Sequence, residues 1–333
     1  MKSLRKPRHT TAALLTLICL ATCAGFISGV FSHRQQSFPY RQLAQMIGRQ
    51  TTTPDYVYRP PEYDYQATLQ CIDQLSDSSA KPLARVLVVG HAYGPVGGTN
   101  RGVDTRLIEF LSSSGERWDL MAMTGDIVSN ATRHNLRLAR NQLSPYARQL
   151  SVAPGNHDVG TTSDNALRDI FEEVFGPTYS AVVFTDALLV FVDLSVGWTL
   201  DSEQRNWLQD LLTNSDLYSQ IIVFSHQLVW AEHVGADLAP NSFDGLVGEP
   251  DFAALLDLFQ GVSVPIMFVA GDVGVGKNPG LYCGTRDGVH FIANGLGKES
   301  DYLIELTVLE HGGLSVYPIE LGSQLQKPSS QNN

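Results

Sequence analysis

The chain has 333 residues, of which 43% are hydrophobic and 17% are charged, and its formal net charge is -11. This composition is typical of a folded globular protein and excludes a chain that is disordered throughout. The negative charge argues against nucleic acid or an anionic lipid surface as a partner, because both select for a basic face. We therefore expect no nucleic-acid partner.

The N-terminus combines a basic flank with a long uncharged segment. Four Lys and Arg residues lie among the first nine, and residues 11–31 then carry no charge. This segment is long enough to span a bilayer, and the basic flank predicts that its start stays in the cytoplasm. We expect a signal anchor or transmembrane helix over residues 1–31, with the rest of the chain extracytoplasmic. A cleaved signal peptide, which would give a secreted protein, and lipidation at Cys23 are the alternatives.

Composition changes along the rest of the chain and divides it into three parts. Residues 32–80 are rich in polar residues and proline and predict a stalk and lead-in; the main domain follows at 81–322, and a disordered tail at 323–333. Cys71 and Cys283 are the cysteines outside the apolar segment. An oxidising compartment allows them to form a disulfide, and two separate buried thiols are the alternative.

The main domain alternates apolar, β-branched runs with amphipathic segments. Strands are expected at residues 85–89, 120–123, 149–153, 181–184, 188–193, 221–224 and 265–270, and helices at 65–75, 104–111, 133–143, 201–212 and 250–259. Asp201 and Gln204 have the spacing of a capping box. This alternation predicts an α/β fold. Asp287-Gly288 and Gly312-Gly313 predict turns between later strands, so we expect the C-terminal part to be antiparallel.

Polar side chains follow five of the strands at the point where each strand ends. They are His91, Asp126, Asn156-His157, His226 and Asp272. A single His or Asp at such a position is commonly a cap or a turn residue. Five of them predict a site at one edge of a sheet, where the carboxyl ends of the strands meet. Oxygen and imidazole donors together suit divalent Mn, Fe or Zn.

With the motifs Gly125-Asp126, Gly155-Asn156-His157-Asp158 and Ser225-His226, the chain resembles the calcineurin-like metallophosphoesterases over most of residues 86–321. That family's pattern is Asp-x-His, Gly-Asp, Gly-Asn-His-Asp/Glu, a His after a strand, and Gly-His-x-His. The resemblance implies a four-layer αββα sandwich and one or two divalent metal ions. It also implies hydrolysis of a phosphomonoester or phosphodiester by a metal-activated hydroxide.

The first and last motifs depart from the family pattern. His91-Ala92-Tyr93 stands where Asp-x-His is expected, and Asp272-Val273-Gly274 where His-x-His is expected. By the resemblance, one metal site keeps four plausible ligands, which are Asp126, Asn156, His226 and Asp272. The other keeps Asp126 and His91, with Tyr93 as a third candidate, although a phenol must lose its proton to bind well.

The resemblance also implies catalytic roles for three residues. Asp126 would bridge the metals, His157 would stabilise the phosphoryl oxygens or protonate the leaving group, and Asp158 would orient His157. His233, in the loop after His226, is a candidate replacement ligand.

Two other functions compete with the phosphoesterase. The losses at Tyr93 and Gly274 favour a non-catalytic binding or scaffolding protein of the same fold, in a cell-envelope or polysaccharide assembly system. Residues 271–277 match a phosphate-binding loop ending in Lys277, but Pro279-Gly280 prevents the helix that this loop requires. The substrate and the oligomeric state are left open.

Overall fold

The computed structural model describes residues 65–75, 80–95, 98, 100–163, 166–231, 241, 249–275, 279–297 and 301–321. The chain divides into two compact units, Met1–Arg59 and Pro60–Asn333, and every described residue belongs to the second. Within this described part, no helix is long and apolar enough to cross a membrane. The predicted anchor, the stalk as far as residue 64 and the predicted tail lie outside the described residues.

The first sheet combines three parallel strands with an antiparallel pair, in the order β11-β10-β1-β2-β3. Its strands are β1 (Pro82–Gly90), β2 (Trp118–Thr124), β3 (Ala147–Ala153), β10 (Tyr302–Leu309) and β11 (Leu314–Glu320). The parallel register pairs Gly90 with Thr124 and Thr124 with Ala153. The last residues of β1, β2 and β3 are thus paired with one another across the sheet. The residues that follow these strands therefore meet at one edge of the sheet.

The second sheet has the order β4-β5-β6-β7-β9-β8. Its strands are β4 (Ser180–Phe184), β5 (Ala187–Phe191), β6 (Gln220–Ser225), β7 (Ile266–Ala270), β8 (Leu281–Arg286) and β9 (Val289–Asn294). β5, β6, β7 and β9 are parallel, and antiparallel β4 and β8 form the edges. Ser225 pairs with Ala270, so β6 and β7 also end level.

The expectation of an antiparallel C-terminal part is only partly correct. β8 and β9 form the predicted hairpin, in which Asp287 and Gly288 have φ angles of 53° and 80°. However, β9 is parallel to β7, and the next hairpin, β10 with β11, belongs to the first sheet. A turn motif determines the pairing of its own two strands, but it does not select the distant strand that pairs with either of them.

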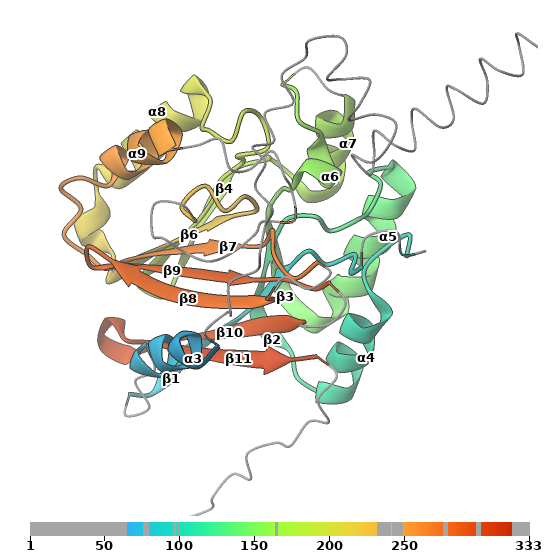
Figure 1. The fold of residues 1–333 in the computed structure, drawn as a ribbon, viewed down its shortest axis with the longest axis horizontal. Helices are drawn as coiled ribbons and strands as arrows, with labels where there is room; N and C mark the ends of the chain where they lie inside the picture. Colours follow the sequence, from blue (N-terminus) through green and yellow to red (C-terminus); the bar gives the residue numbers. More distant parts are fainter. Residues whose placement is uncertain are drawn as a thin grey trace, which may run out of the picture. The chain divides into compact units, whose positions relative to one another are not determined.

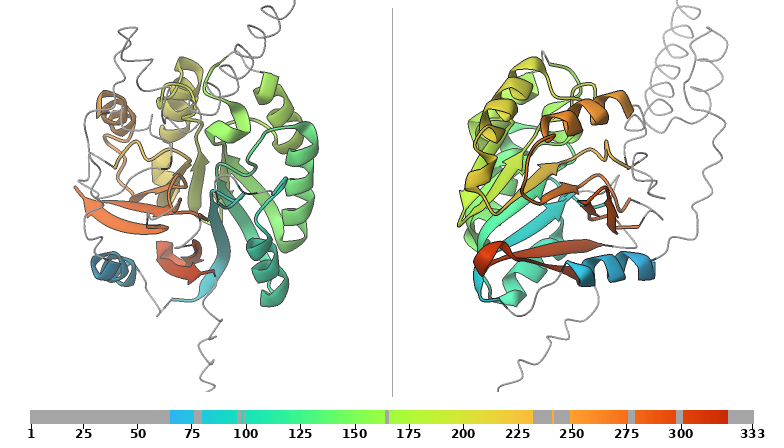
Figure 2. Two further views of the ribbon diagram at one scale, coloured as in Figure 1. Left: turned by 45° about the vertical axis from the view of Figure 1, so that its right-hand side comes forward. Right: turned by 90° about the vertical axis from the view of Figure 1, so that its left-hand side faces the viewer.

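The two sheets pack face to face with helices on their outer faces (Figures 1 and 2). Helices α4 (Thr105–Ser114), α5 (Arg133–Leu143) and α7 (Ala166–Phe175) cover the first sheet, and α8 (Ser202–Leu212) and α9 (Glu249–Leu258) cover the second. Strand periodicity explains the layers: Val86 and Val88 of β1 face the second sheet, while Leu87 and Val89 pack under the helices.

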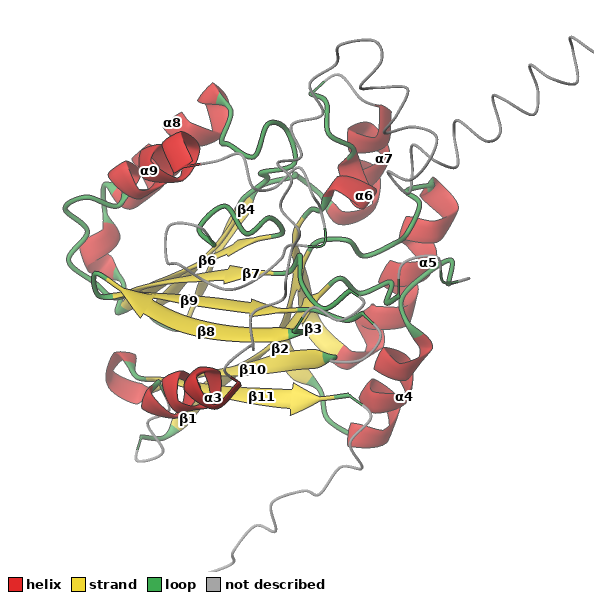
Figure 3. Cartoon of the chain, viewed as in Figure 1, coloured by secondary structure: helices red, strands yellow, loops and turns green. Residues whose placement is uncertain are grey.

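The helices, drawn in red in Figure 3, begin largely at the residues that the sequence predicts. α5 matches its predicted range, and the Asp201 carboxylate accepts a hydrogen bond from the Gln204 N–H at the start of α8. The Gln204 side chain does not complete a capping box. Instead it is buried and bonds both the N–H and the carbonyl of Asp193, at 2.7 and 2.9 Å. α7 was not predicted, although its apolar residues recur at helical spacing.

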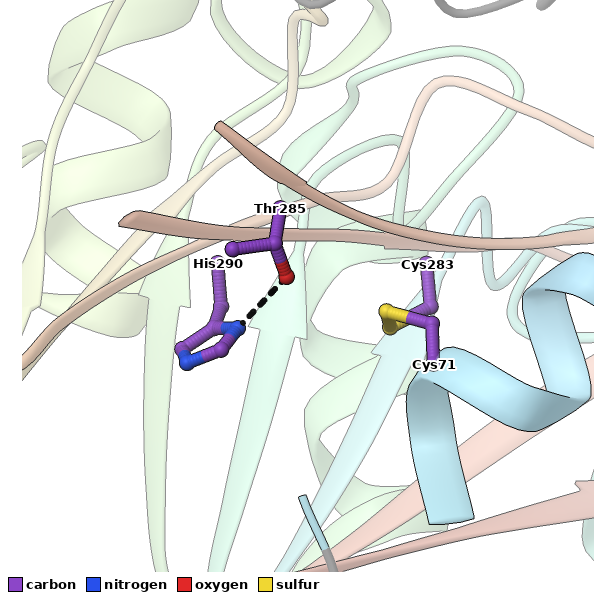
Figure 4. Close-up of a disulfide and its surroundings, with 4 residues drawn as sticks. All are labelled: Cys71, Cys283, Thr285 and His290. Atoms are coloured by element: carbon purple, nitrogen blue, oxygen red, sulfur yellow. Dashed lines mark hydrogen bonds between the residues drawn. A yellow bond between two sulfur atoms is a disulfide. The ribbon is translucent and has the colours of Figure 1, made fainter. Parts of the chain in front are cut away.

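Helix α3 (Tyr65–Gln74) is joined to the second sheet by a disulfide (Figure 4). Cys71 of α3 is bonded to Cys283 of β8, which decides between the two alternatives left open for these cysteines. The bond links positions that are 212 residues apart in the sequence. The end of the predicted lead-in is therefore part of the compact unit.

Candidate active site

Side chains predicted at the strand ends gather around the carboxylate of Asp126. His91 and Asp126 lie beyond β1 and β2 of the first sheet, and His226 lies directly after β6 of the second. Nε2 of His91 is 3.6 Å from Asp126 Oδ2, and Nε2 of His226 is 3.3 Å from Asp126 Oδ1. Nε2 of His226 is also 3.5 Å from Oδ1 of Asp272, beyond β7. All four side chains are buried.

The motif after β3 forms the short helix α6 (Asn156–Val159), which begins beside Asp126. The His157 N–H donates to Asp126 Oδ1 over 3.1 Å, and Nε2 of the same His157 is 4.0 Å from Asp126 Oδ2. The His157 side chain is 39% exposed, whereas His91 and His226 are buried. His157 is therefore the imidazole of this group that faces solvent.

Three imidazoles are oriented in the same way. In each, Nδ1 contacts a backbone carbonyl oxygen and Nε2 lies toward the Asp126 carboxylate. The carbonyls are Leu296 for His91, Thr124 for His226 and Ser129 for His157, at 2.8, 2.9 and 2.9 Å. A carbonyl that accepts from Nδ1–H leaves Nε2 as the free ring nitrogen of a neutral imidazole. Metal-binding histidines are usually held in this way.

The backbone at the strand ends is strained and closely packed. His91 and Asp126 have φ angles of 51° and 52°. Residues other than glycine seldom adopt this left-handed region. A Cβ on Gly155 would lie 2.2 Å from Asp126 Oδ1, and a Cβ on Gly271 would lie 1.9 Å from the Thr124 carbonyl oxygen. Glycine at 271 lets the two sheets approach each other at the site, and glycine at 155 lets the loop after β3 pack against Asp126.

Burial and charge act in opposite directions on the central pair. Burial lowers the pKa of His226, but the carboxylates of Asp126 and Asp272 raise it by more than burial lowers it. The resulting pKa is about 10. Burial raises the pKa of Asp126, and the imidazoles of His226 and His157 outweigh it, so that this pKa lies well below its usual range. Without a metal, His226 is therefore an imidazolium between two carboxylates.

The first motif has a different electrostatic character. Burial lowers the pKa of His91 to about 4, so its imidazole is neutral at pH 7. Burial also raises the pKa of Tyr93, so its phenol keeps its proton. The Tyr93 ring packs against His91 with 4.3 Å between ring centroids and against His157 with 5.2 Å. We call these three side chains the ring stack.

Asp158 links the loops that carry the site. Its buried carboxylate accepts from the N–H groups of Ile127 and Val128, at 2.9 and 3.3 Å, and from Gly155 N–H at 2.9 Å. Burial raises the pKa of Asp158 to about 7, and the nearby charge of Asp126 adds to this effect. These bonds hold the loop after β2 against α6, so Asp158 positions the backbone around His157 and Asp126.

The structure adds residues that sequence reasoning missed. Gln227 is buried, and within the described part of the chain neither atom of its side-chain amide has a hydrogen-bond partner. Its place directly after the predicted ligand His226 is the signal by which the sequence could have indicated it. Asn241 donates its N–H to the Asp272 carbonyl over 2.8 Å, and no pattern in the sequence predicts this contact. His233 and Lys277 lie outside the described residues.

The donor set suits a divalent metal in kind, because it combines carboxylate oxygens with an imidazole nitrogen. Within the described part, His226 Nε2 is buried without a hydrogen-bond partner, 3.3 and 3.5 Å from oxygens of Asp126 and Asp272. Ligands of a tetrahedral metal with bonds of about 2.1 Å lie about 3.4 Å apart. As placed, no group of three or more His, Cys, Asp or Glu among the described residues could hold a metal ion. The site is therefore not a preassembled cage.

Solved structures with a similar fold include three hydrolases. Purple acid phosphatase PPD1 from yellow lupin (Lupinus luteus) seeds is 15% identical with a TM-score of 0.51, covering 73% of this chain and 52% of that chain. A putative 5'-nucleotidase from Staphylococcus aureus is 14% identical, with a TM-score of 0.43 and 74% and 56% covered. Phosphopantetheinyl hydrolase from Mycobacterium tuberculosis is 12% identical, with a TM-score of 0.39 and 74% and 98% covered.

This chain thus spans about half the length of the lupin phosphatase that it matches. No family model matches the sequence, and no curated protein does. The match to the purple acid phosphatase confirms the fold expected from the motifs. The chain has the calcineurin-like metallophosphoesterase fold, which it shares with the lupin phosphatase.

Proposed function

We propose that this protein is a metal-dependent phosphoesterase that hydrolyses a phosphomonoester or a phosphodiester on the extracytoplasmic side of a membrane. One observation carries the proposal: three imidazoles, each with Nδ1 on a backbone carbonyl, present Nε2 to the single carboxylate of Asp126. Histidines that only pack together need not turn the same ring nitrogen toward one carboxylate. Histidines that surround a cation bound to that carboxylate must do so.

Asp126, Asn156, His226 and Asp272 would hold the metal, which is Mn, Fe or Zn by the kind of donor. When bound, such an ion polarises a phosphoryl oxygen and lowers the pKa of a bound water, so that hydroxide is available near neutral pH. The Thr124 carbonyl holds the His226 ring with Nε2 toward Asp126, which orients this donor before a metal binds.

His157 is the residue placed to handle a proton. Burial lowers the pKa of His157, but Asp126 and the Ser129 carbonyl raise it more, and the net shift is upward. The ring therefore holds a proton more readily than a free imidazole, and it is the one that reaches solvent. At Nε2 this proton can pass to the oxygen of a departing group or hydrogen-bond a phosphoryl oxygen. Asp158 keeps the His157 backbone in place for this role.

Two observations support an extracytoplasmic location. The uncharged segment at residues 11–31 follows a basic flank. The bond between Cys71 and Cys283 is of a kind that persists mainly in oxidising compartments. We expect the full chain to stay in the membrane fraction through an alkaline carbonate wash and a chain beginning at Ser32 to be released. Release of both would count against the anchor.

The test of the activity uses the full chain in detergent with Mn, Fe or Zn added singly. We expect hydrolysis of an aryl phosphate or a bis-aryl phosphodiester that stops when the metal is chelated. Asp126→Asn keeps the volume of the side chain but removes its charge, and it should lower the rate by more than about 100-fold. Thermal unfolding of the variant, near that of the wild type, would exclude misfolding. Lack of hydrolysis with every metal and both substrates would refute the proposal.

A non-catalytic binding module of the same fold, serving cell-envelope or polysaccharide assembly, is the second candidate. It is favoured by Tyr93 and Gly274, which stand where the family has imidazole ligands, and by the absence of a preassembled metal group among the described residues. Elemental analysis separates the two functions. Divalent metal bound to the purified chain supports the esterase, and metal-free protein supports the binding module.

A further inference from the structure

We infer that a pocket lined by Arg117, Arg140 and Arg148 binds the phosphate group of a ligand, at the end of the first sheet opposite the candidate active site. The inference goes beyond the proposed function and does not depend on it, because no residue of the pocket belongs to the metal centre. The observation behind it is that three guanidinium groups line one cavity in a chain whose net charge is -11.

The arginine pocket, as we call this cavity, lies where the starts of β2 and β3 meet the ends of α5 and α7. It has a volume of about 340 Å³, a size typical of small-molecule sites, and Ser144, Gln149 and Phe175 line it together with the three arginines. β2 has 7 residues, so at about 3.3 Å per residue its start lies roughly 20 Å from the end that leads to Asp126. The two sites are therefore separate.

Two of the three guanidinium groups have no carboxylate partner among the described residues. Nη1 of Arg148 lies 3.3 Å from an oxygen of Asp119, which compensates the charge of this arginine. Arg117 and Arg140 contact only backbone carbonyls. No acidic side chain is among the described residues that line the pocket. The pocket thus holds two positive charges that the described part of the chain does not neutralise.

Most N–H donors of Arg117 and Arg140 remain available to a ligand. A guanidinium group has five N–H donors. Nη1 of Arg140 donates to the Val174 carbonyl over 2.7 Å, and Nη2 of Arg117 lies 3.5 Å from the Ala147 carbonyl oxygen. Neither side chain makes a further hydrogen bond within the described ranges. Each can therefore donate to two oxygens of one anion.

Charge and donors fit a phosphate monoester better than a carboxylate. A phosphate monoester carries about two negative charges at pH 7 and has three strongly accepting oxygens. A carboxylate has a single charge and two oxygens. Two uncompensated guanidinium groups therefore match the phosphate, and arginine is the side chain whose shape suits it. Phe175 gives the pocket an apolar wall for the rest of the ligand.

The same helix contains two arginines that differ from this arrangement. Arg133 and Arg137 of α5 both pair with Glu173, at 2.7 and 2.6 Å, and neither is among the residues that line the pocket. Replacing this pair removes as much charge from the chain as replacing Arg117 and Arg140. The two double variants therefore separate binding in the pocket from attraction by net charge.

Isothermal titration calorimetry of the full chain in detergent, with inorganic phosphate as the probe, tests the site. Phenanthroline, an uncharged chelator, keeps the metal centre empty, and Asp126→Asn is titrated in parallel. We expect phosphate to bind both proteins with the same Kd and acetate to bind more than about 10-fold more weakly. Loss of phosphate binding in Asp126→Asn would place the anion at the metal centre and overturn the inference.

The double change Arg117→Gln and Arg140→Gln should raise the Kd for phosphate more than about 10-fold, because it removes two charged hydrogen-bond donors. The double change Arg133→Gln and Arg137→Gln should leave the Kd within about 3-fold of the wild type, since these exposed charges are screened. Thermal unfolding checks that both variants are folded. An equal loss of binding in the two variants would show an effect of net charge alone and would overturn the inference.

A second measurement separates a soluble phosphate from a lipid headgroup. The full chain in phosphatidylcholine nanodiscs is mixed with phosphatidylcholine vesicles that contain or lack phosphatidic acid. Capture only by phosphatidic acid, lost in the Arg117→Gln and Arg140→Gln variant, would identify a headgroup as the source. Binding of free phosphate without such capture would identify a soluble ligand. Failure of both probes to bind would refute the inference.

Discussion

Asp126 is the residue on which the geometry of the site depends. Its two oxygens receive contacts from three histidines, its φ angle is positive, and the glycine at position 155 leaves space for its carboxylate. No neighbouring cation other than these imidazoles compensates its charge within the described part of the chain. The protonation of His226 is therefore tied directly to what occupies the site.

The affinity for metal should rise with pH. The pKa of His226 is raised to about 10, so the ring is protonated at neutral pH and must lose this proton before Nε2 can bind a metal. One proton released per metal predicts a rise in affinity of about 100-fold between pH 6 and pH 8. Competition against a chelating dye at each pH would measure this rise.

His290 supplies a matched control for this titration. Its Nδ1 is bonded to Thr285 in the β8–β9 hairpin, outside the site (Figure 4). His290→Ala should keep the same slope of affinity against pH. An affinity that does not change between pH 6 and pH 8 would contradict the role given to His226.

At the scale of the elements, the site exists because strands from two sheets end close together. The Thr124 carbonyl at the end of β2 accepts from the His226 ring of the loop after β6, and the His91 ring bonds the Leu296 carbonyl beyond β9. Glycines make this approach possible, since a side chain on either sheet would separate the strand ends.

Replacement of Gly271 should damage both stability and the site. In Gly271→Ala the added Cβ would lie 1.9 Å from the Thr124 carbonyl oxygen, so the sheets must separate locally. We expect a loss of about 1–3 kcal/mol in the free energy of unfolding, together with weaker metal binding. Urea denaturation and dye competition would measure the two effects.

Gly115→Ala is the comparison for this variant. Gly115 follows α4 with a φ angle of 64°, and a Cβ there meets nothing within 4 Å. The substitution should cost about 1–2 kcal/mol through the backbone alone and leave metal binding unchanged. Equal metal affinity in both variants would contradict the close approach of the sheets at the site.

At the scale of the whole molecule, a single covalent link joins the start of the described chain to an edge strand. Cys71 and Cys283 close a loop across 212 residues (Figure 4). Around this bond α3 packs on β8 and β11. β8 is an edge strand of the second sheet and lies in the same sheet as β6 and β7, which lead to the site. The disulfide therefore restrains an edge of the domain rather than the site itself.

Removal of this link should lower stability and leave the site intact. We expect the double change Cys71→Ala and Cys283→Ala to reduce the free energy of unfolding by about 2–5 kcal/mol, because the unfolded chain regains the freedom that a long closed loop loses. Reductant should shift the urea midpoint of the wild type toward that of the variant and have no effect on the variant itself. Identical midpoints for the two proteins would contradict this role.

The local pattern of apolar, capping and turn residues was enough to predict many helices, caps and turns. The helix at 133–143, the cap at Asp201 and the turn at Asp287-Gly288 were confirmed, because each depends on residues within one or two turns of one another. The parallel pairing of β9 with β7 was not predicted, since no local signal selects a partner strand. α7 was missed because its apolar residues were not read as a helical pattern.

By itself the sequence determined the chemistry at the strand ends. A polar residue that closely follows an apolar run can be recognised from adjacent positions, and so His91, Asp126, Asn156, His226 and Asp272 were predicted from the sequence. Only the tertiary structure decided which oxygen of Asp126 each imidazole faces, that Tyr93 lies between two rings, and that Cys71 pairs with Cys283. The physical reason is that these contacts join residues far apart in the chain, whose distances are set by how two sheets pack and not by any local pattern.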